Sequence, residues 1–123
     1  MSLMLPAAFR LRSSADFAAT IGRGVRVGRP TLVVHAQRRA GDDVSIGGNQ
    51  VGFVVSKAVG GAVVRNRVKR RLRALARPLA MDDATQGFRV VIRALPPAAT
   101  QPGRLGDDLA GAWAAATTKA VAS

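Results

Sequence analysis

The chain has 123 residues, with 19 Lys and Arg against 7 Asp and Glu, and no cysteine. This length predicts one domain, and the lack of cysteine excludes a disulfide framework and a thiolate metal site or nucleophile. A formal net charge of +12 predicts a polyanionic partner, nucleic acid above all. No stretch reaches the roughly 18 apolar residues of a membrane span, so we expect a soluble, cytoplasmic protein.

The stretch RSSADFAATIGRG predicts a short first helix. Ser13 stands three residues before Asp16, the spacing of a capping pair, and Phe17 and Ile21 lie four apart on one face. A glycine at the end of this stretch stops the helix.

Strands follow the first helix. They are predicted at residues 29–37 (RPTLVVHAQ) and 50–57 (QVGFVVSK), with a short leading strand at 22–30. Within the first of the two longer strands, Leu32, Val34 and Ala36 share one face. A polar loop, RRAGDDVSIGGN, joins these two strands.

The last third of the chain predicts a strand and a helix. In GFRVVIRAL one face carries Phe88, Val90, Ile92 and Ala94, and the other carries Arg89, Val91 and Arg93. That alternation is typical of a half-buried strand. LPPAATQPG is a linker, and apolar residues then recur at helical spacing: Leu105, Leu109, Ala112, Trp113 and Ala116.

Between these parts lies the basic segment GGAVVRNRVKRRLRALARP, Gly60 to Pro78, which has seven Lys or Arg residues and no acid. Its apolar residues form one narrow helical stripe: Val64, Val68, Leu72, Leu75 and Leu79. The remaining surface is positive: Asn66, Lys69, Arg70, Arg73 and Arg77 lie opposite the stripe, Arg65 and Arg71 flank it, and Arg67 lies between Arg70 and Arg71. Pro78 predicts that the helix ends near Arg77.

A run of charges is most often a solvated helix face, but such faces mix both signs so that residues four apart attract each other. This segment has no acid, so nucleic-acid contact is favoured. Binding to acidic lipid is disfavoured because Val and Leu are its only apolar anchors. The glycines of SKAVGGAV, before the helix, fit either a phosphate at a helix N-terminus or a turn that needs glycine.

At these residues the sequence resembles a known family. VGFVVSKAVGGAVVRNRVKRRLR resembles the signature of the bacterial ribonuclease P protein component, in which an Arg-Asn-Arg core, here Arg65, Asn66 and Arg67, follows a strand that ends in Ser-Lys, here Ser56 and Lys57. LRSSADF and FRVVIRALP also look like the family, so the resemblance covers Leu11 to Pro96. MLPAAFRLR is compatible with a natural start at Met4 as well as at Met1.

The resemblance implies a function. In this family an RNA subunit is the catalyst, and the protein helps it to remove the 5′ leader of precursor tRNA. We therefore expect a single RNA-binding domain over residues 1–123, with a flexible segment at 1–10. The expected partners are the ribonuclease P RNA and precursor tRNA, with no membrane and no evident protein partner. The family fold is an α+β sandwich with a left-handed strand-helix-strand crossover around the basic helix, unlike the usual hand.

The resemblance also implies two RNA-binding surfaces. The basic helix and the loop before it meet the catalytic RNA through Lys57, Arg65, Asn66, Arg67, Lys69, Arg70 and Arg73. A cleft between the first helix and the sheet holds the single-stranded leader through Phe17, Ile21, Val34, Lys57 and Arg65. Phe17 is either a stacking platform or a core residue that packs with Ile21.

This chain departs from the family pattern at three positions. Ile21 and Val34 stand where relatives often have an aromatic residue, and Gly61 replaces an asparagine. The leader cleft should therefore rely on aliphatic contacts and charge, with weaker base stacking.

No catalytic residue and no metal ligand is predicted in the protein itself. The carboxylates are Asp16 and three adjacent pairs, at 42–43, 82–83 and 107–108, which read as loop or helix-start residues. His35 reads as a side chain on a sheet face, with RNA contact as the alternative. Magnesium is expected to be bound chiefly by the RNA subunit. The rival functions are a non-catalytic RNA-binding or ribosome-associated protein and a protein-only nuclease.

Overall fold

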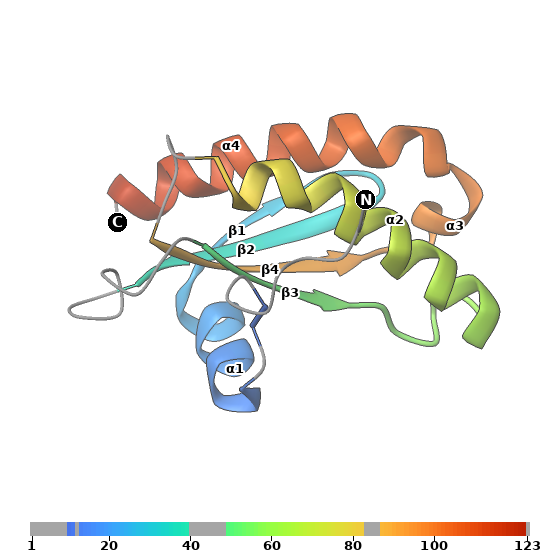
Figure 1. Ribbon diagram of the computed structural model, residues 1–123, viewed down its shortest axis with the longest axis horizontal. Coiled ribbons are helices and arrows are strands. Elements are labelled where there is room, and N and C mark those ends of the chain that lie inside the picture. Colours follow the sequence, from blue (N-terminus) through green and yellow to red (C-terminus); the bar gives the residue numbers. More distant parts are fainter. Residues whose placement is uncertain (1–9, 12, 40–48, 83–86, 123) are drawn as a thin grey trace.

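The computed structural model of the chain describes residues 10–11, 13–39, 49–82 and 87–122 (Figure 1). Its elements in chain order are α1 (Ser14–Arg23), β1 (Val25–Gly28), β2 (Leu32–Arg38), β3 (Gln50–Val54), α2 (Ala62–Ala80), β4 (Phe88–Ala94), α3 (Pro97–Thr100), the 3-10 turn η3 (Pro102–Arg104) and α4 (Leu105–Ala122). The predicted α+β class is confirmed, and so is the short leading strand, β1. The Asp42-Asp43 pair and most of the predicted polar loop lie outside the described residues.

The four strands form one sheet in the order β1-β2-β4-β3. β2 pairs antiparallel with both β1 and β4, whereas β3 and β4 are parallel. Neighbouring parallel strands need a long crossover connection, and α2 supplies it. The left-handed sense of this crossover stays a prediction from the family resemblance.

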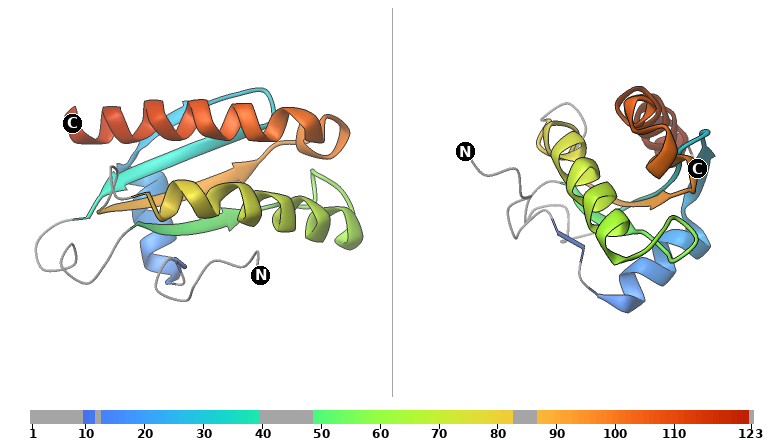
Figure 2. Two further views of the ribbon diagram at one scale, coloured as in Figure 1. Left: turned by 45° about the horizontal axis from the view of Figure 1, so that its top comes forward. Right: turned by 90° about the vertical axis from the view of Figure 1, so that its right-hand side faces the viewer.

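Both long helices pack on one face of this sheet, and α1 packs on the other (Figure 2). On the two-helix face, Leu32, Val34 and Ala36 are each fully buried, as their shared face predicted. α4 contributes a broad set of buried residues: Leu105, Asp108, Leu109, Ala112, Trp113, Ala116, Thr117 and Ala120. α4 is thus the helix most deeply embedded in the core.

α2 touches the core along a narrower stripe. Its buried residues are Val68, Leu72, Ala76 and Ala80, and Val64, Leu75 and Leu79 pack partly buried beside them. The predicted stripe is confirmed, but alanines, which its apolar pattern did not include, occupy the centre at the C-terminal half. Small side chains allow the helix to lie close to the sheet and leave most of its circumference outside the core.

α1 begins as its sequence predicts, because the Ser13 hydroxyl accepts a hydrogen bond from the backbone N–H of Asp16 at 3.3 Å. The ring of Phe17 lies directly against Gly52 of β3, where a side chain on residue 52 would collide with it. Glycine at position 52 therefore permits the close approach of α1 to the sheet.

The predicted flexible segment covers residues 1–10, of which the structure describes only Arg10; residues 1–9 lie outside the described residues. Arg10 forms a parallel β-bridge with Val51, and the N–H of Leu11 donates to the carbonyl of Val51 at 3.0 Å. The backbone of Arg10 thus lies along the edge of β3, and the expectation of a flexible segment stays a prediction.

The basic helix does not end near Arg77, as Pro78 predicted, but continues to Ala80. Proline removes one backbone donor, but hydrogen bonds from a residue outside the helix stabilise the turn that contains it. The Asn49 amide donates to the Ala80 carbonyl at 3.2 Å and accepts from the N–H of Phe88 at 3.0 Å. Asn49 is fully buried, so one side chain joins the end of α2 to the start of β4.

Two further expectations need to be refined. The linker that follows β4 contains the short helical segments α3 and η3. β4 has one fully buried face, as predicted, but Val91 on the other face is buried as well, while Arg89 and Arg93 on that face are not. The physical reason is that α1 packs against β2 and β4 on that side.

Candidate nucleic-acid interface

The outer surface of α2 carries the densest charge of the described residues. Asn66, Arg67, Arg70 and Arg71 are exposed, and Arg65, Lys69, Arg73 and Arg77 are half-buried. No ion pair joins any cation from Arg65 to Arg73 to a described carboxylate. Since like charges three or four residues apart on a helix repel each other, this surface is electrostatically unfavourable until an anion covers it.

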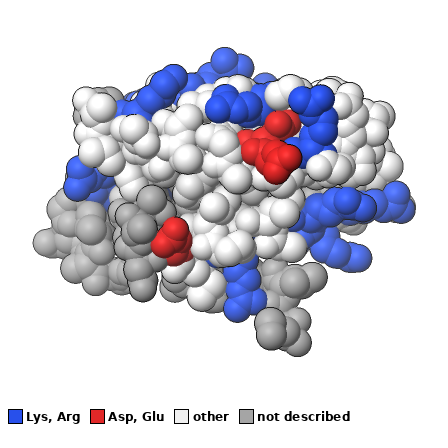
Figure 3. Space-filling view, turned by 90° about the horizontal axis from the view of Figure 1, so that it is seen from above, with Lys and Arg blue, Asp and Glu red and all other residues white. Residues whose placement is uncertain are grey.

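Seen from the side of the two long helices, the charges are distributed unevenly (Figure 3). Lys and Arg side chains line the margin of this face, and acidic side chains are confined to two spots. The middle of the face is uncharged. A polyanion would therefore meet positive charge at the margins of this face.

The turn before α2 explains one of the two glycines there. The N–H of Val59 donates to the Ser56 carbonyl at 3.1 Å, and the N–H of Gly60 donates to the Lys57 carbonyl at 3.2 Å. A Cβ on Gly60 would lie 2.8 Å from Cγ1 of Val64, so this close approach requires glycine. The turn interpretation thus accounts for Gly60.

The second glycine has room for a side chain. Gly61 is the N-cap of α2, makes no side-chain capping bond, and has open space where a Cβ would stand. The N-terminus of α2 therefore lacks the capping oxygen that an asparagine would supply.

The face of the sheet toward α1 carries a second set of polar residues. The strand register places Arg26, His35, Val91 and Gly52 in one row across β1, β2, β4 and β3. The next row contains Gly28, Val33, Arg93 and Val54. Arg26 and Arg93 are exposed, so this face of the sheet carries two guanidinium groups among largely apolar residues.

His35 lies in the middle of this face of the sheet and is only 3% exposed. Neither of its ring nitrogens has a hydrogen-bond partner. Burial lowers the pKa of His35, and the positive charges of Arg26 and Arg93 lower it further. A neutral imidazole is thus favoured there, as a side chain on a sheet face, and RNA contact by His35 stays a prediction.

One predicted leader contact is wrong. Val34 is fully buried within the core that the sheet forms with α2 and α4, so a leader could not reach it without opening the core. The β2 residues that face α1 are its neighbours Val33, His35 and Gln37. The sequence could not show this, because both faces of β2 are buried over most of its length.

The other predicted leader residues lie at separate places around the α1 side and the start of α2. Phe17 is half-buried over Gly52, and Ile21 on the same helix is 38% exposed. Lys57 is exposed in the turn after β3, and Arg65 lies in the first turns of α2 with a buried Nε that lacks a hydrogen-bond partner. Sequence reasoning did not include Arg26 and Arg93, although the alternation of β4 had placed Arg93 away from the core.

Two of the described carboxylates, Asp16 and Asp108, have roles in the fold. Asp16 lies 3.8 Å from the guanidinium of Arg89. Asp108 is buried and accepts hydrogen bonds from the N–H and the hydroxyl of Thr31, at 3.1 and 2.6 Å. In the part of the chain that the structure describes, no three His, Cys, Asp or Glu residues come together as a metal site, and no helix there is long and apolar enough to cross a membrane.

Solved structures share this fold. The ribonuclease P protein of Staphylococcus aureus superposes with a TM-score of 0.74 at 24% identity, covering 88% of this chain and 94% of that one. The protein from Thermotoga maritima gives a TM-score of 0.65 at 23% identity, with 83% and 92% covered. At these identities the similarity establishes the fold.

Sequence comparison goes further. The family model described as Ribonuclease P matches residues 5–116. The ribonuclease P protein component of Rhodococcus opacus is 55% identical over 103 residues, which cover 82% of each chain. That of a Mycobacterium species (strain KMS) is 46% identical over 121 residues, 98% of this chain and 99% of the relative. With its basic α2, its sheet order and these relatives, the chain belongs to the ribonuclease P protein component family.

Proposed function

We propose that this chain is the protein subunit with which a catalytic ribonuclease P RNA removes the 5′ leader from precursor tRNA in the cytoplasm. The observation that carries the proposal is the outer surface of α2, where the cations from Arg65 to Arg73 have no described carboxylate as a partner. A phosphate backbone supplies the missing negative charge and removes the repulsion within the helix.

In this proposal α2 binds the RNA subunit. Arg67 and Arg70 are exposed and can each reach a phosphate, and Arg offers a planar fork of donors that suits phosphate oxygens. Asn66 offers both a donor and an acceptor beside them. If about five phosphates are engaged, the logarithm of the affinity should fall with the logarithm of the salt concentration with a slope near −4.

The leader lies on the face of the sheet toward α1. Lys57, Arg93 and Arg26 are exposed around that face, and Phe17 and Ile21 offer an apolar edge on α1. A single strand binds by backbone charge together with contacts to its bases. With one aromatic ring and several cations, the charge contribution should dominate here, and leader binding should depend strongly on salt.

The chemistry of cleavage is assigned to the RNA. Among the described residues no acidic cluster suits a metal ion, and Asp16 and Asp108 are engaged within the fold. We therefore propose that magnesium is bound chiefly by the RNA subunit, where it would stabilise charge at the attacked phosphate. The residues of this chain bind and orient the two RNAs.

The proposal is tested by cleavage of a leader-bearing precursor tRNA at low magnesium concentration by the ribonuclease P RNA of the same organism, with and without the protein. Cleavage at the 5′ junction that needs both components is expected. If the protein binds RNA but leaves cleavage unchanged, it is a general RNA-binding protein. If it cuts without the RNA, it is a nuclease in its own right and the proposal fails.

Two variants separate the surfaces. Arg67→Ala should weaken assembly with the RNA subunit, whereas Phe17→Ala should weaken binding of precursor with a leader and leave assembly intact. Assembly is measured by titration of the RNA subunit, and substrate binding by titration of the assembled enzyme with precursors that have or lack the leader. Equal effects of both variants on both measurements would show that the two surfaces are wrongly assigned.

A further inference from the structure

A pocket of about 350 Å³ lies between the middle of α2 and the start of α4. Residues of α2, of η3 and of the first turn of α4 line it: Arg71, Ala74, Leu75, Pro102, Gly103 and Gly106. Small-molecule sites in proteins occupy about 300–1,000 Å³, so this pocket has room for one flat group of modest size. Because α2 forms one of its walls, the pocket adjoins the cationic surface of that helix.

Two glycines keep this pocket open. A Cβ on Gly103 would have no heavy atom within 4 Å apart from its chain neighbours, and a Cβ on Gly106 would meet only Cδ2 of Leu75, at an ordinary contact distance of 3.7 Å. Neither glycine has a positive φ, so neither backbone conformation nor packing requires glycine there. Glycine also makes a helix less stable. The missing side chains therefore indicate that the space serves a ligand.

The lining favours an uncharged flat group over a phosphate. Arg71 is the one charged residue among the lining residues, and Asp107, next to Gly106 in the sequence, is an exposed acid in the first turn of α4. Arg71 is exposed and forms no ion pair with a described carboxylate. Proteins stack unpaired RNA bases on guanidinium planes, and the apolar lining residues suit the rest of a base. The pocket thus has the chemistry of a nucleobase site.

The position of the pocket indicates which RNA supplies the base. Arg67 and Arg71 are one turn of α2 apart, roughly 6 Å along the helix axis. Arg67 and Arg70 are exposed on the surface that we assign to the RNA subunit, so an RNA backbone bound there lies within one turn of the pocket. The face proposed for the leader is on the other side of the sheet, toward α1. The RNA subunit is therefore the nearer source of a base.

We propose that this pocket receives one unstacked base of the ribonuclease P RNA. The base lies against the guanidinium of Arg71 and is enclosed by Ala74, Leu75 and Pro102, while neighbouring phosphates lie at Arg67 and Arg70. This inference rests on the proposed function, since α2 meets the RNA subunit only in that proposal. A stacked base adds affinity without a further phosphate contact, so it should not steepen the dependence of the affinity on salt.

The experiment measures the affinity of the protein for the ribonuclease P RNA of the same organism, without tRNA, over a range of salt concentrations. Gly103→Leu fills the pocket, keeps every charge and has open space for its side chain in the free protein. It should bind the RNA about fivefold or more weakly, with the same salt slope as the unaltered protein. Arg71→Lys keeps the charge but removes the flat guanidinium, and it should weaken binding in the same way.

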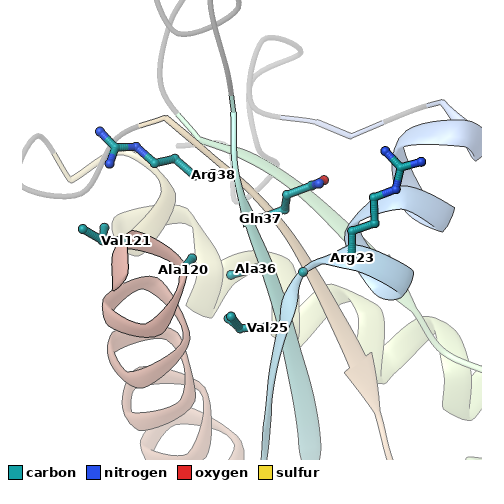
Figure 4. A pocket seen from close by; sticks show the side chains of 8 residues that line it. Arg23, Val25, Ala36, Gln37, Arg38, Ala120 and Val121 are labelled. Carbon is teal, nitrogen blue, oxygen red and sulfur yellow. The ribbon is translucent and has the colours of Figure 1, made fainter. Parts of the chain in front are cut away.

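A second pocket supplies the control for added bulk. Its volume is about 270 Å³, and it lies at the other end of α4, where the side chains of Arg23 and Arg38 point away from each other (Figure 4). Val121 lines it and stands roughly 20 Å along α4 from Gly106. Val121→Phe should leave the RNA affinity unchanged. Arg104→Lys, at an exposed residue outside the lining of the first pocket, is the control for the change from Arg to Lys.

Chemical probing of the RNA bases gives a direct measurement of the contact. In the complex with the unaltered protein, one base or two neighbouring bases should be protected in addition to the backbone positions covered by α2. With Gly103→Leu that base protection should disappear while the backbone protection remains. Thermal unfolding of each variant verifies that it is folded.

The outcomes separate the inference from the proposed function. Unchanged RNA affinity in both variants would overturn the inference in favour of a protein partner for the pocket. A shallower salt slope for Gly103→Leu would overturn it as well, because the pocket would then hold a phosphate, and so would a loss confined to the binding of precursor tRNA by the assembled enzyme. If the unaltered protein does not bind the RNA subunit at all, the proposed function itself fails.

Discussion

α2 and α4 are nearly equal in length and lie on the same face of one sheet, yet their roles differ. α4 buries eight residues along its length, including Trp113, and carries only two acids and one lysine. α2 buries four and carries seven Lys or Arg residues without an acid. Burial of apolar area stabilises the fold, so α4 holds the sheet together. α2 is attached by a narrow stripe and presents the rest of its surface to a partner.

The largest expected effect is the loss of stability when the buried Trp113 side chain of α4 is removed. Trp113→Ala leaves a large cavity in the core, because Trp113 is 3% exposed. The free energy of unfolding should fall by about 3–5 kcal/mol, as measured by chemical denaturation. Val121→Ala, at a position that is 56% exposed, is the control and should change it little. A small effect of Trp113→Ala would show that α4 does not carry the core.

The next largest effect on stability is expected at the C-terminal end of α2, which Asn49 joins to β4. Asn49→Ala leaves the N–H of Phe88 and the carbonyl of Ala80 without their buried partner, and the free energy of unfolding should fall by about 1–3 kcal/mol. Because the lost bonds lie at the far end of α2 from Arg65 and Arg67, the affinity of the folded protein for the RNA subunit should be unchanged. A weaker affinity with normal stability would contradict this division along the helix.

A substitution in the charged surface of α2 should have the reverse effect: stability is kept and RNA affinity falls. Arg67→Ala should leave stability unchanged or raise it by about 0.2–0.5 kcal/mol, because Arg67 repels Arg70 and Arg71. The affinity for the RNA subunit should fall, and the salt slope should become shallower by roughly 0.7–0.9 for one lost phosphate contact. Lys119→Ala on α4 is the matched loss of charge and should not alter the slope. The measurement is RNA binding over a range of salt concentrations.

The opposite face of the sheet adds a third region that neither long helix covers. The pKa of His35 is lowered in the folded protein from the ordinary value of 6.5, so the unfolded chain binds more protons as the pH falls through that value. Stability should therefore be at its full value above about pH 6.5 and fall as the pH decreases below it. His35→Gln does not titrate, and its unfolding should depend less on pH between 5 and 7, as measured by denaturation at each pH.

The smallest expected effect concerns the start of α2. Gly61→Asn supplies a capping oxygen where the backbone is already extended and space is open, and it should stabilise the protein by a few tenths of a kcal/mol. Thermal unfolding measures this gain. Gly60→Asn is the matched control and should destabilise, because its Cβ would lie against Val64. Stabilisation by both substitutions would contradict the structure of this turn.

The sequence by itself determined the elements and the character of their surfaces. The alternation in β4, the capping pair of α1 and the stripe of α2 are read within a few residues, because helices and strands repeat over that distance. The charge of α2 needed no structure either, since a helix whose polar residues include seven cations and no acid is positive wherever it lies. The family resemblance rested on the same local pattern.

The tertiary structure decided which faces meet. Leu32, Val34 and Ala36 were expected on one face, but only the packing of the helices showed that this face is the core and that His35 faces α1. The same holds for the row of Arg26 and His35 and for the turn at Pro78, whose end is fixed by hydrogen bonds from Asn49. These features depend on contacts between residues far apart in the chain. A period of two tells which side chains share a face, but it does not tell what will cover that face.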